Sequence, residues 1–135
     1  DVSAAHQPLH RDYMHEQIAA RCPAMSLPMS VWYDQDEPTE HWWRTSKGEV
    51  ITILAERGVD QGCPLASPAY GVTTAGIADE AAQSIRASDA EAQLLQYADD
   101  TQVFTDPGNL TDSYNTVSDM WARAGLRLNP VKTKV

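Results

Sequence analysis

The four residues Tyr97-Ala98-Asp99-Asp100 constrain this chain more than any other stretch. Apolar and β-prone residues flank them, in Leu94–Tyr97 before the turn and in Thr101–Phe104 after it. Two such runs around a short polar turn predict a β-hairpin. Its tip would carry two adjacent carboxylates, which repel each other and which folding does not require. A divalent cation would relieve the repulsion, because hard ions such as Mg²⁺ take carboxylate oxygens; a solvated acidic turn is the alternative.

Composition indicates one soluble domain. The length of 135 residues fits a single domain, and a hydrophobic content of 42% is enough for a core. We see no signal peptide and no apolar run near the roughly 20 residues that a membrane helix needs, so we expect no membrane partner. Cys22 and Cys63 are too few for a disulfide framework. A reducing, intracellular location follows, with nucleus or cytoplasm left open.

The order of predicted elements indicates an α+β fold, with helices packed on one face of an antiparallel sheet. Apolar spacing predicts helices over 8–22, 67–87 and 109–124, the second opened by Ser67-Pro68 and the third closed by Gly125. A second hairpin is predicted from Trp42–Thr45 and Val50–Glu56, and a last strand over Leu126–Asn129. The stretch 23–38 is expected to be mainly loop.

Four blocks of sequence together resemble a known family. They are Asp1–His6, then Arg57–Leu65 followed by Ser67–Tyr70, then the acidic tetrad, and last Gly125–Thr133. In this order and spacing they resemble the palm of a reverse transcriptase. The closest likeness is to the non-LTR retrotransposon and group II intron type, whose hairpin reads Tyr-Ala-Asp-Asp. The resemblance runs almost end to end and thins between residues 23 and 47; in one departure, Ala66 stands before Ser67-Pro68.

The resemblance implies an RNA-directed DNA polymerase of a retroelement. Residues 1–135 would form a partial palm with a hairpin insertion around 42–56, and fingers, thumb and the strand that delivers Asp1 would lie outside it. We therefore expect the isolated fragment to be inactive. A net charge of −9 argues against nucleic acid as a partner, since Lys and Arg hold phosphates. In such polymerases the basic contacts come largely from fingers and thumb.

The resemblance also implies the catalytic centre. Two Mg²⁺ ions, or Mn²⁺ in their place, would be held by Asp1, Asp99, Asp100 and the backbone carbonyl of Val2. Successive side chains on a strand point to opposite faces, so we expect Asp99 to be the bridging ligand and Asp100 a secondary one. Lys132 would protonate or neutralise the pyrophosphate, since an ammonium group suits a phosphate; an ordinary surface lysine is the alternative.

Four further residues would bind the nucleotide or the template. Gln61 and Tyr97 are implied contacts, and Gly62 would let the backbone approach the nucleotide. His6 occupies the position at which the family carries Phe or Tyr, the aromatic that excludes the ribose 2′-hydroxyl. The implied partners are an RNA template, a DNA primer and deoxynucleoside triphosphates, and the oligomeric state is left open.

Two other functions compete with this interpretation. A decayed, non-catalytic remnant that acts at most in protein contacts is favoured by His6, by the shifted Ser67-Pro68 and by the acidic charge. The second alternative is a palm of the viral RNA polymerase or telomerase type, which would use the same two-metal mechanism. The Tyr-Ala-Asp-Asp hairpin and the Gln61–Leu65 block fit that second competitor less well.

Overall fold

The computed structural model describes residues 6, 8–34, 36–60 and 62–134. The elements follow in the order α1 (Arg11–Arg21), a 3-10 turn (Pro23–Met25), α2 (Ser26–Trp32), β1 (Thr39–Arg44), β2 (Val50–Ala55), α3 (Ala66–Ser88), β3 (Gln93–Tyr97), β4 (Asp100–Phe104), a second 3-10 turn (Pro107–Asn109) and α4 (Leu110–Arg123). The predicted α+β class, the three helices and the two hairpins are confirmed.

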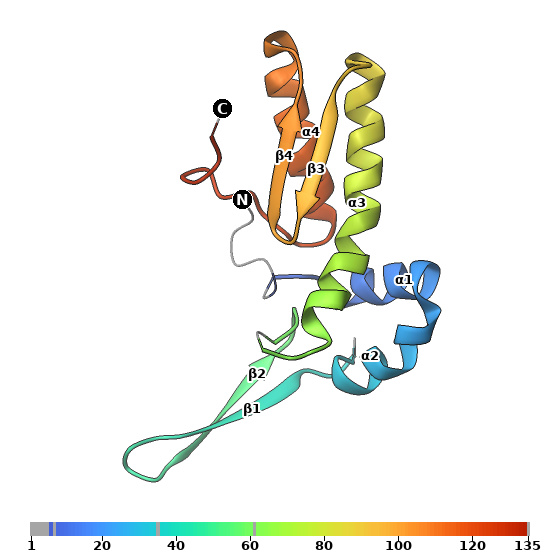
Figure 1. Cartoon of the computed structure of the whole chain (residues 1–135). Coiled ribbons are helices and arrows are strands. Elements are labelled where there is room, and N and C mark those ends of the chain that lie inside the picture. The colour runs from blue at the N-terminus through green and yellow to red at the C-terminus, as the bar shows by residue number, and fades with distance from the viewer. Residues whose placement is uncertain (1–5, 7, 35, 61, 135) are drawn as a thin grey trace.

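Helix α3 is the element against which the rest of the body packs (Figure 1). Its buried face is largely small, with Ala69, Ala81 and Gly76, so neighbouring helices approach closely. A Cβ atom at Gly76 would come within 2.7 Å of the Arg21 guanidinium and of Gln17 Oε1 on α1. A glycine that weakens an isolated helix therefore permits tight packing of α1 on α3.

The hairpin β3–β4 is covered on one face. Its register places Leu94 opposite Val103, and both side chains are half-buried on the side of the helices. Figure 1 shows α3 and α4 on that side of the hairpin. Alternate residues on the other face, among them Leu95 and Phe104, are exposed. This alternation is the pattern of an antiparallel pair with one packed face and one solvated face.

The hairpin β1–β2 leaves the body as a projecting ribbon (Figure 1). Trp42, Trp43, Ile51 and Ile53 are all exposed, although they are large and apolar. Gly48 in its connecting turn has φ +86°, a conformation that favours glycine. In the described part of the chain β1 pairs only with β2, and β3 only with β4, so the two hairpins form separate two-stranded sheets.

Three local predictions are wrong. The stretch 23–38 contains a 3-10 turn and α2, because Pro23 and Pro28 both fall in first turns, where a missing N–H costs nothing. Residues 126–129 form no strand: Leu128 makes a single bridge, and Asn129 begins a turn before Pro130. Helix α3 starts after Leu65, so Ser67 lies inside its first turn and does not cap it.

Candidate functional site

The acidic tetrad forms the tip of β3–β4. Tyr97 pairs with Asp100, which leaves Ala98 and Asp99 as a two-residue turn, with Ala98 at φ +51°. The two carboxylates stand in different surroundings: Asp99 is half-buried, whereas Asp100 is exposed at the start of β4. Tyr97 is 85% exposed on the outer face. The tip therefore presents one carboxylate toward the body of the protein and one toward solvent.

A chain of side-chain hydrogen bonds fixes this tip to α3. The Gln96 amide nitrogen donates both to the Ala98 carbonyl, at 3.1 Å, and to the Thr74 hydroxyl, at 2.8 Å. Thr74 in turn donates to the carbonyl of Tyr70, at 2.9 Å. The turn that carries Asp99 is thus tied, through two side chains, to the first turns of α3. Sequence reasoning missed Gln96 because an isolated glutamine in a strand gives no functional signal.

Tyr70 brings the start of α3 close to the acidic turn. Its side chain is only 2% exposed, and its hydroxyl has no hydrogen-bond partner among the described residues. Burial, and next to it the negative charge of Asp99, raise the pKa of the Tyr70 phenol. The His6 ring stacks on the Tyr70 ring, with centroids 4.9 Å apart and planes 30° apart. His6, Tyr70 and Asp99 therefore converge from three separate segments of the chain.

The loop that carries the Gln61-Gly62 pair lies beside His6. The Val59 amide donates to the His6 carbonyl at 2.9 Å, and the Gly58 amide donates to the Leu9 carbonyl at 2.8 Å. Gly62 has φ +91°, which favours glycine, and a Cβ atom there would meet nothing within 4 Å. Gly62 is therefore required by the backbone conformation of the turn, and the space beside its Cα is open.

Two buried residues that sequence reasoning missed hold this loop. The Tyr33 hydroxyl accepts a hydrogen bond from the Asp60 amide at 3.1 Å, and the Tyr33 ring lies under the Arg11 guanidinium. Arg11 is almost fully buried and donates to the carbonyls of Gly58 and of two residues before β1, and to the Thr39 hydroxyl. Burial raises the pKa of the Tyr33 phenol, with a hydrogen bond to the Cys63 side chain as the next cause.

Lys132 lies in an ordered turn after α4. The Asn129 side-chain oxygen accepts hydrogen bonds from the amides of Val131 and Lys132, and the Asn129 carbonyl accepts one from the Thr133 hydroxyl at 2.7 Å. The Lys132 side chain is exposed. Asn129 thus shapes the turn, and Asn before Pro is the sequence signal that could have revealed it.

Part of the predicted site lies outside the described residues. Asp1, Val2 and Gln61 fall there, so the structure does not test their roles. Among the described residues no three His, Cys, Asp or Glu side chains gather as a metal-binding group. The tip offers two carboxylates, whose oxygens are the type of donor that Mg²⁺ prefers. The described residues of the tip therefore offer such an ion two neighbouring carboxylates.

Comparison with protein-family models gives a match over most of the chain. No helix in the described part of the chain is long and apolar enough to cross a membrane. Searches of curated proteins and of solved structures found no match. A family model described as reverse transcriptase (RNA-dependent DNA polymerase) matches residues 10–135. Membership implies nucleotidyl transfer and, in the full-length enzyme, binding of a template and a primer. The chain belongs to the reverse transcriptase family.

Proposed function

We propose that this domain is the palm of a retroelement polymerase, of the non-LTR retrotransposon or group II intron type, and that it performs RNA-templated DNA synthesis. The observation that carries the proposal is the convergence of His6, Tyr70 and Asp99 beside the loop before Gly62. Two of these positions were predicted from the blocks of sequence that resemble the family. The link through Gln96 and Thr74 to α3 supports the proposal, because it gives the turn that carries Asp99 the defined position that a metal ligand requires.

The proposed metal centre is built on Asp1, Asp99 and Asp100, with the Val2 carbonyl as a further ligand. Two Mg²⁺ ions would supply charge neutralisation at the phosphates when bound. Asp99 is suited to the bridging position, because its half-buried place on the turn faces Tyr70. The exposed Asp100 is suited to a secondary position. The Gln96 hydrogen bonds would keep the turn from rotating when the two carboxylates are drawn together.

The proposed sugar pocket is the surface formed by His6 and Tyr70. The partly exposed His6 ring would form the wall of the pocket, and the buried Tyr70 ring stacks against it from behind. Imidazole is smaller and more polar than the Phe or Tyr of the family, so we expect weaker exclusion of ribonucleotides. In the full-length polymerase, His6→Phe should raise the preference for deoxynucleotides over ribonucleotides about tenfold. Equal discrimination by both proteins would reject this role for His6.

Lys132 is proposed to neutralise the leaving pyrophosphate. The turn ordered by Asn129 holds its backbone, so the side chain starts from a defined position. Lys132→Met should lower the rate of incorporation while primer binding is unchanged, because the charge is needed only as the phosphate departs. Loss of primer affinity with an unchanged rate would assign Lys132 to nucleic-acid binding.

The proposed activity is tested by primer extension with the full-length polymerase, an RNA template, a DNA primer and Mg²⁺. Asp99→Asn removes one negative charge and little volume, and should lower the rate at least a hundredfold. The matched control is Asp119→Asn, an exposed acid on α4 that should leave the rate unchanged. We expect Asp100→Asn to have an intermediate effect and the isolated 135-residue chain to show no activity. Wild-type rates in Asp99→Asn would refute the proposed centre.

A further inference from the structure

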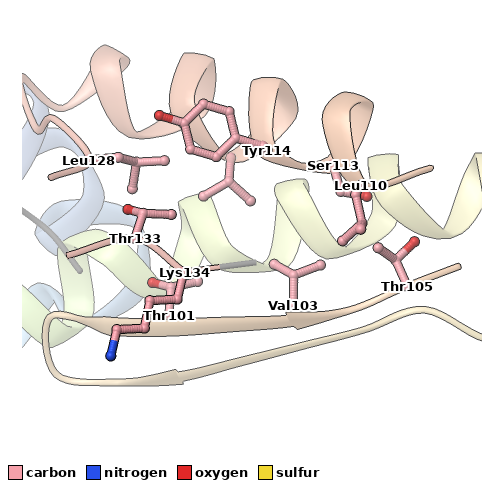
Figure 2. Close-up of a pocket in the computed structure, with 10 residues that line it drawn as sticks. Thr101, Val103, Thr105, Leu110, Ser113, Tyr114, Leu128, Thr133 and Lys134 are labelled. Atoms are coloured by element: carbon pink, nitrogen blue, oxygen red, sulfur yellow. The ribbon is translucent and has the colours of Figure 1, made fainter. Parts of the chain in front are cut away.

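A long polar side chain, that of Gln96, lies on the helix-facing side of the hairpin β3–β4. The half-buried Gln96 stands between exposed residues of β3 and shares its face with Leu94. Figure 2 shows the same face on β4, where the short side chains of Thr101 and Val103 are directed toward α4. An amide placed against helices costs free energy unless its polar atoms are hydrogen-bonded, so its partners indicate its role.

The partners of the Gln96 amide leave one orientation for it. Its nitrogen lies 2.8 Å from the Thr74 hydroxyl and 3.1 Å from the Ala98 carbonyl oxygen. The Thr74 hydroxyl donates its single proton to the Tyr70 carbonyl, at 2.9 Å, so toward Gln96 it can only accept. Both acceptors therefore need the N–H end of the amide, and Gln96 donates one hydrogen to each of them.

The two ends of this chain of hydrogen bonds, the Gln96–Thr74 link, belong to the two halves of the proposed site. At one end, the Ala98 carbonyl directly precedes Asp99, the proposed bridging ligand. At the other end, Tyr70 bears both the accepting carbonyl and the ring that stacks on His6. Burial, and next to it the charge of Asp99, raise the pKa of the Tyr70 phenol, so the turn also lies near this ring.

We propose that Gln96 and Thr74 are positioning residues that couple the acidic turn to the proposed sugar pocket, and that they set both the metal requirement and the choice of sugar. This coupling rests on the proposed polymerase function. The nucleotide is held by its phosphates at the turn and by its sugar at His6. The Gln96–Thr74 link fixes the separation of these two holders, and a misplacement of about 1 Å can lower a rate roughly a hundredfold.

Primer extension by the full-length polymerase tests the coupling. Gln96→Met keeps the length of the side chain and removes both donors. It should raise the Mg²⁺ concentration that gives half the maximal rate by about tenfold, because a residue that orients a metal ligand typically contributes this much. At saturating Mg²⁺ it should also lower the preference for deoxynucleotides over ribonucleotides about threefold, because the sugar no longer meets the pocket wall in register.

Matched variants on α3 separate the link from packing. Thr74→Val removes the hydroxyl at constant shape and should reproduce both effects, whereas Thr74→Ser keeps the hydroxyl and should restore values near those of the wild type. Thr73 is the control, since it is equally buried and donates the same kind of bond to the Ala69 carbonyl, at 2.7 Å. Thr73→Val should change neither the magnesium requirement nor the sugar preference. Thr74→Val added to Gln96→Met should have no further effect, because the link is already broken.

The link can also be measured without activity, by NMR on the 135-residue chain. The side-chain N–H protons of Gln96 should exchange with solvent about tenfold more slowly than those of Gln93, which is exposed on the outer face of the same strand. Thr74→Val should remove part of this protection, and Thr73→Val should not. Circular dichroism checks that each variant is folded, and either folded variant of the link, at Gln96 or at Thr74, suffices for the test.

The remaining outcomes contradict the coupling. Fast exchange at Gln96 would mean that the link does not exist in solution. Activity that depends on Asp99, with the magnesium requirement and the sugar preference unchanged in Gln96→Met, would reject the coupling and leave the proposed function intact. Equal effects of Thr73→Val and Thr74→Val would assign both to the packing of α3. Synthesis that does not depend on Asp99 would refute the proposed function, and the coupling with it.

Discussion

The chain contains two β-hairpins, one packed against helices and the other exposed to solvent. Both β1–β2 and β3–β4 are antiparallel pairs with short connections. The hairpin β3–β4 lies on α3 and α4 with its inner face covered, and its turn is fastened through Gln96 and Thr74. The ribbon β1–β2 is exposed on both faces and is held only near its base (Figure 1).

This difference shows that a hairpin can hold functional side chains in place only when one of its faces is packed. A two-stranded pair alone is marginal in water, so its turn has no fixed position until one face packs on another element. Packing and the Gln96 hydrogen bonds give the tip of β3–β4 a defined position, which a functional site requires. The ribbon has no such backing, and its apolar side chains remain available for contact.

The largest expected effect comes from a matched pair of tryptophans. Trp121 near the end of α4 is fully buried, whereas Trp42 on the ribbon is 74% exposed. Trp121→Ala should lower the free energy of unfolding by about 4 kcal/mol, and Trp42→Ala by less than about 0.5 kcal/mol. Urea denaturation of both variants measures this. Comparable losses would mean that the ribbon is packed in solution and that the comparison fails.

The second largest effect is expected at Arg11, whose buried side chain holds the base of the ribbon β1–β2. Arg11→Met leaves the Gly58 carbonyl and its neighbours without their buried donor, so we expect a loss of about 3 kcal/mol. Hydrogen exchange should quicken in β1–β2 more than in β3–β4. Arg21→Met, on the exposed end of the same helix, is the control. Equal acceleration in both hairpins would contradict a separate anchor for the ribbon.

A smaller effect on stability should distinguish Tyr33, near the base of the ribbon, from Tyr70, near the turn of β3–β4. Tyr33 accepts a hydrogen bond from the Asp60 amide, while the Tyr70 hydroxyl has no partner among the described residues. Tyr33→Phe should therefore cost about 1 kcal/mol at neutral pH, and Tyr70→Phe should be neutral or slightly stabilising. Thermal unfolding of the two variants compares them. A large loss in Tyr70→Phe would show that its hydroxyl is bonded in solution.

The buried Tyr70 phenol predicts that the stability of the fold depends on pH in the alkaline range. The folded-state pKa of Tyr70 lies above the ordinary value of about 10, so between these values the unfolded chain loses a proton that the folded chain keeps. Stability is thus fully present below pH 10 and falls as pH rises above it. Tyr70→Phe should remove part of that fall, by about 1 kcal/mol for each pH unit above 10. Unchanged alkaline sensitivity would contradict the burial of the Tyr70 phenol.

Much of this architecture could be predicted from local pattern. Apolar spacing located α1, α3 and α4, and β-prone runs located both hairpins, because those signals depend on neighbours in sequence. The anchors could not be predicted. Arg11 and Gln96 act across 47 and 22 residues, on Gly58 and Thr74, and a lone polar residue gives no sign of a partner so distant. The Asn129 turn was missed because the apolar residues before it favoured a strand.

The smallest expected effect concerns the contact between His41 and Asp60 at the base of the ribbon, which is an ion pair when His41 is protonated. His41 Nε2 on β1 lies 3.2 Å from Asp60 Oδ1, and both side chains are about two-fifths exposed. A double-mutant cycle with His41→Gln and Asp60→Asn should give a coupling of about 0.5 kcal/mol, because solvent screens exposed pairs. Chemical denaturation at low and at raised salt concentration measures it, and salt should lower it. A coupling well above 1 kcal/mol would mean that this pair, in addition to Arg11, fixes the ribbon to the loop before Gly62, and the two hairpins would then be alike in being fastened to the candidate site.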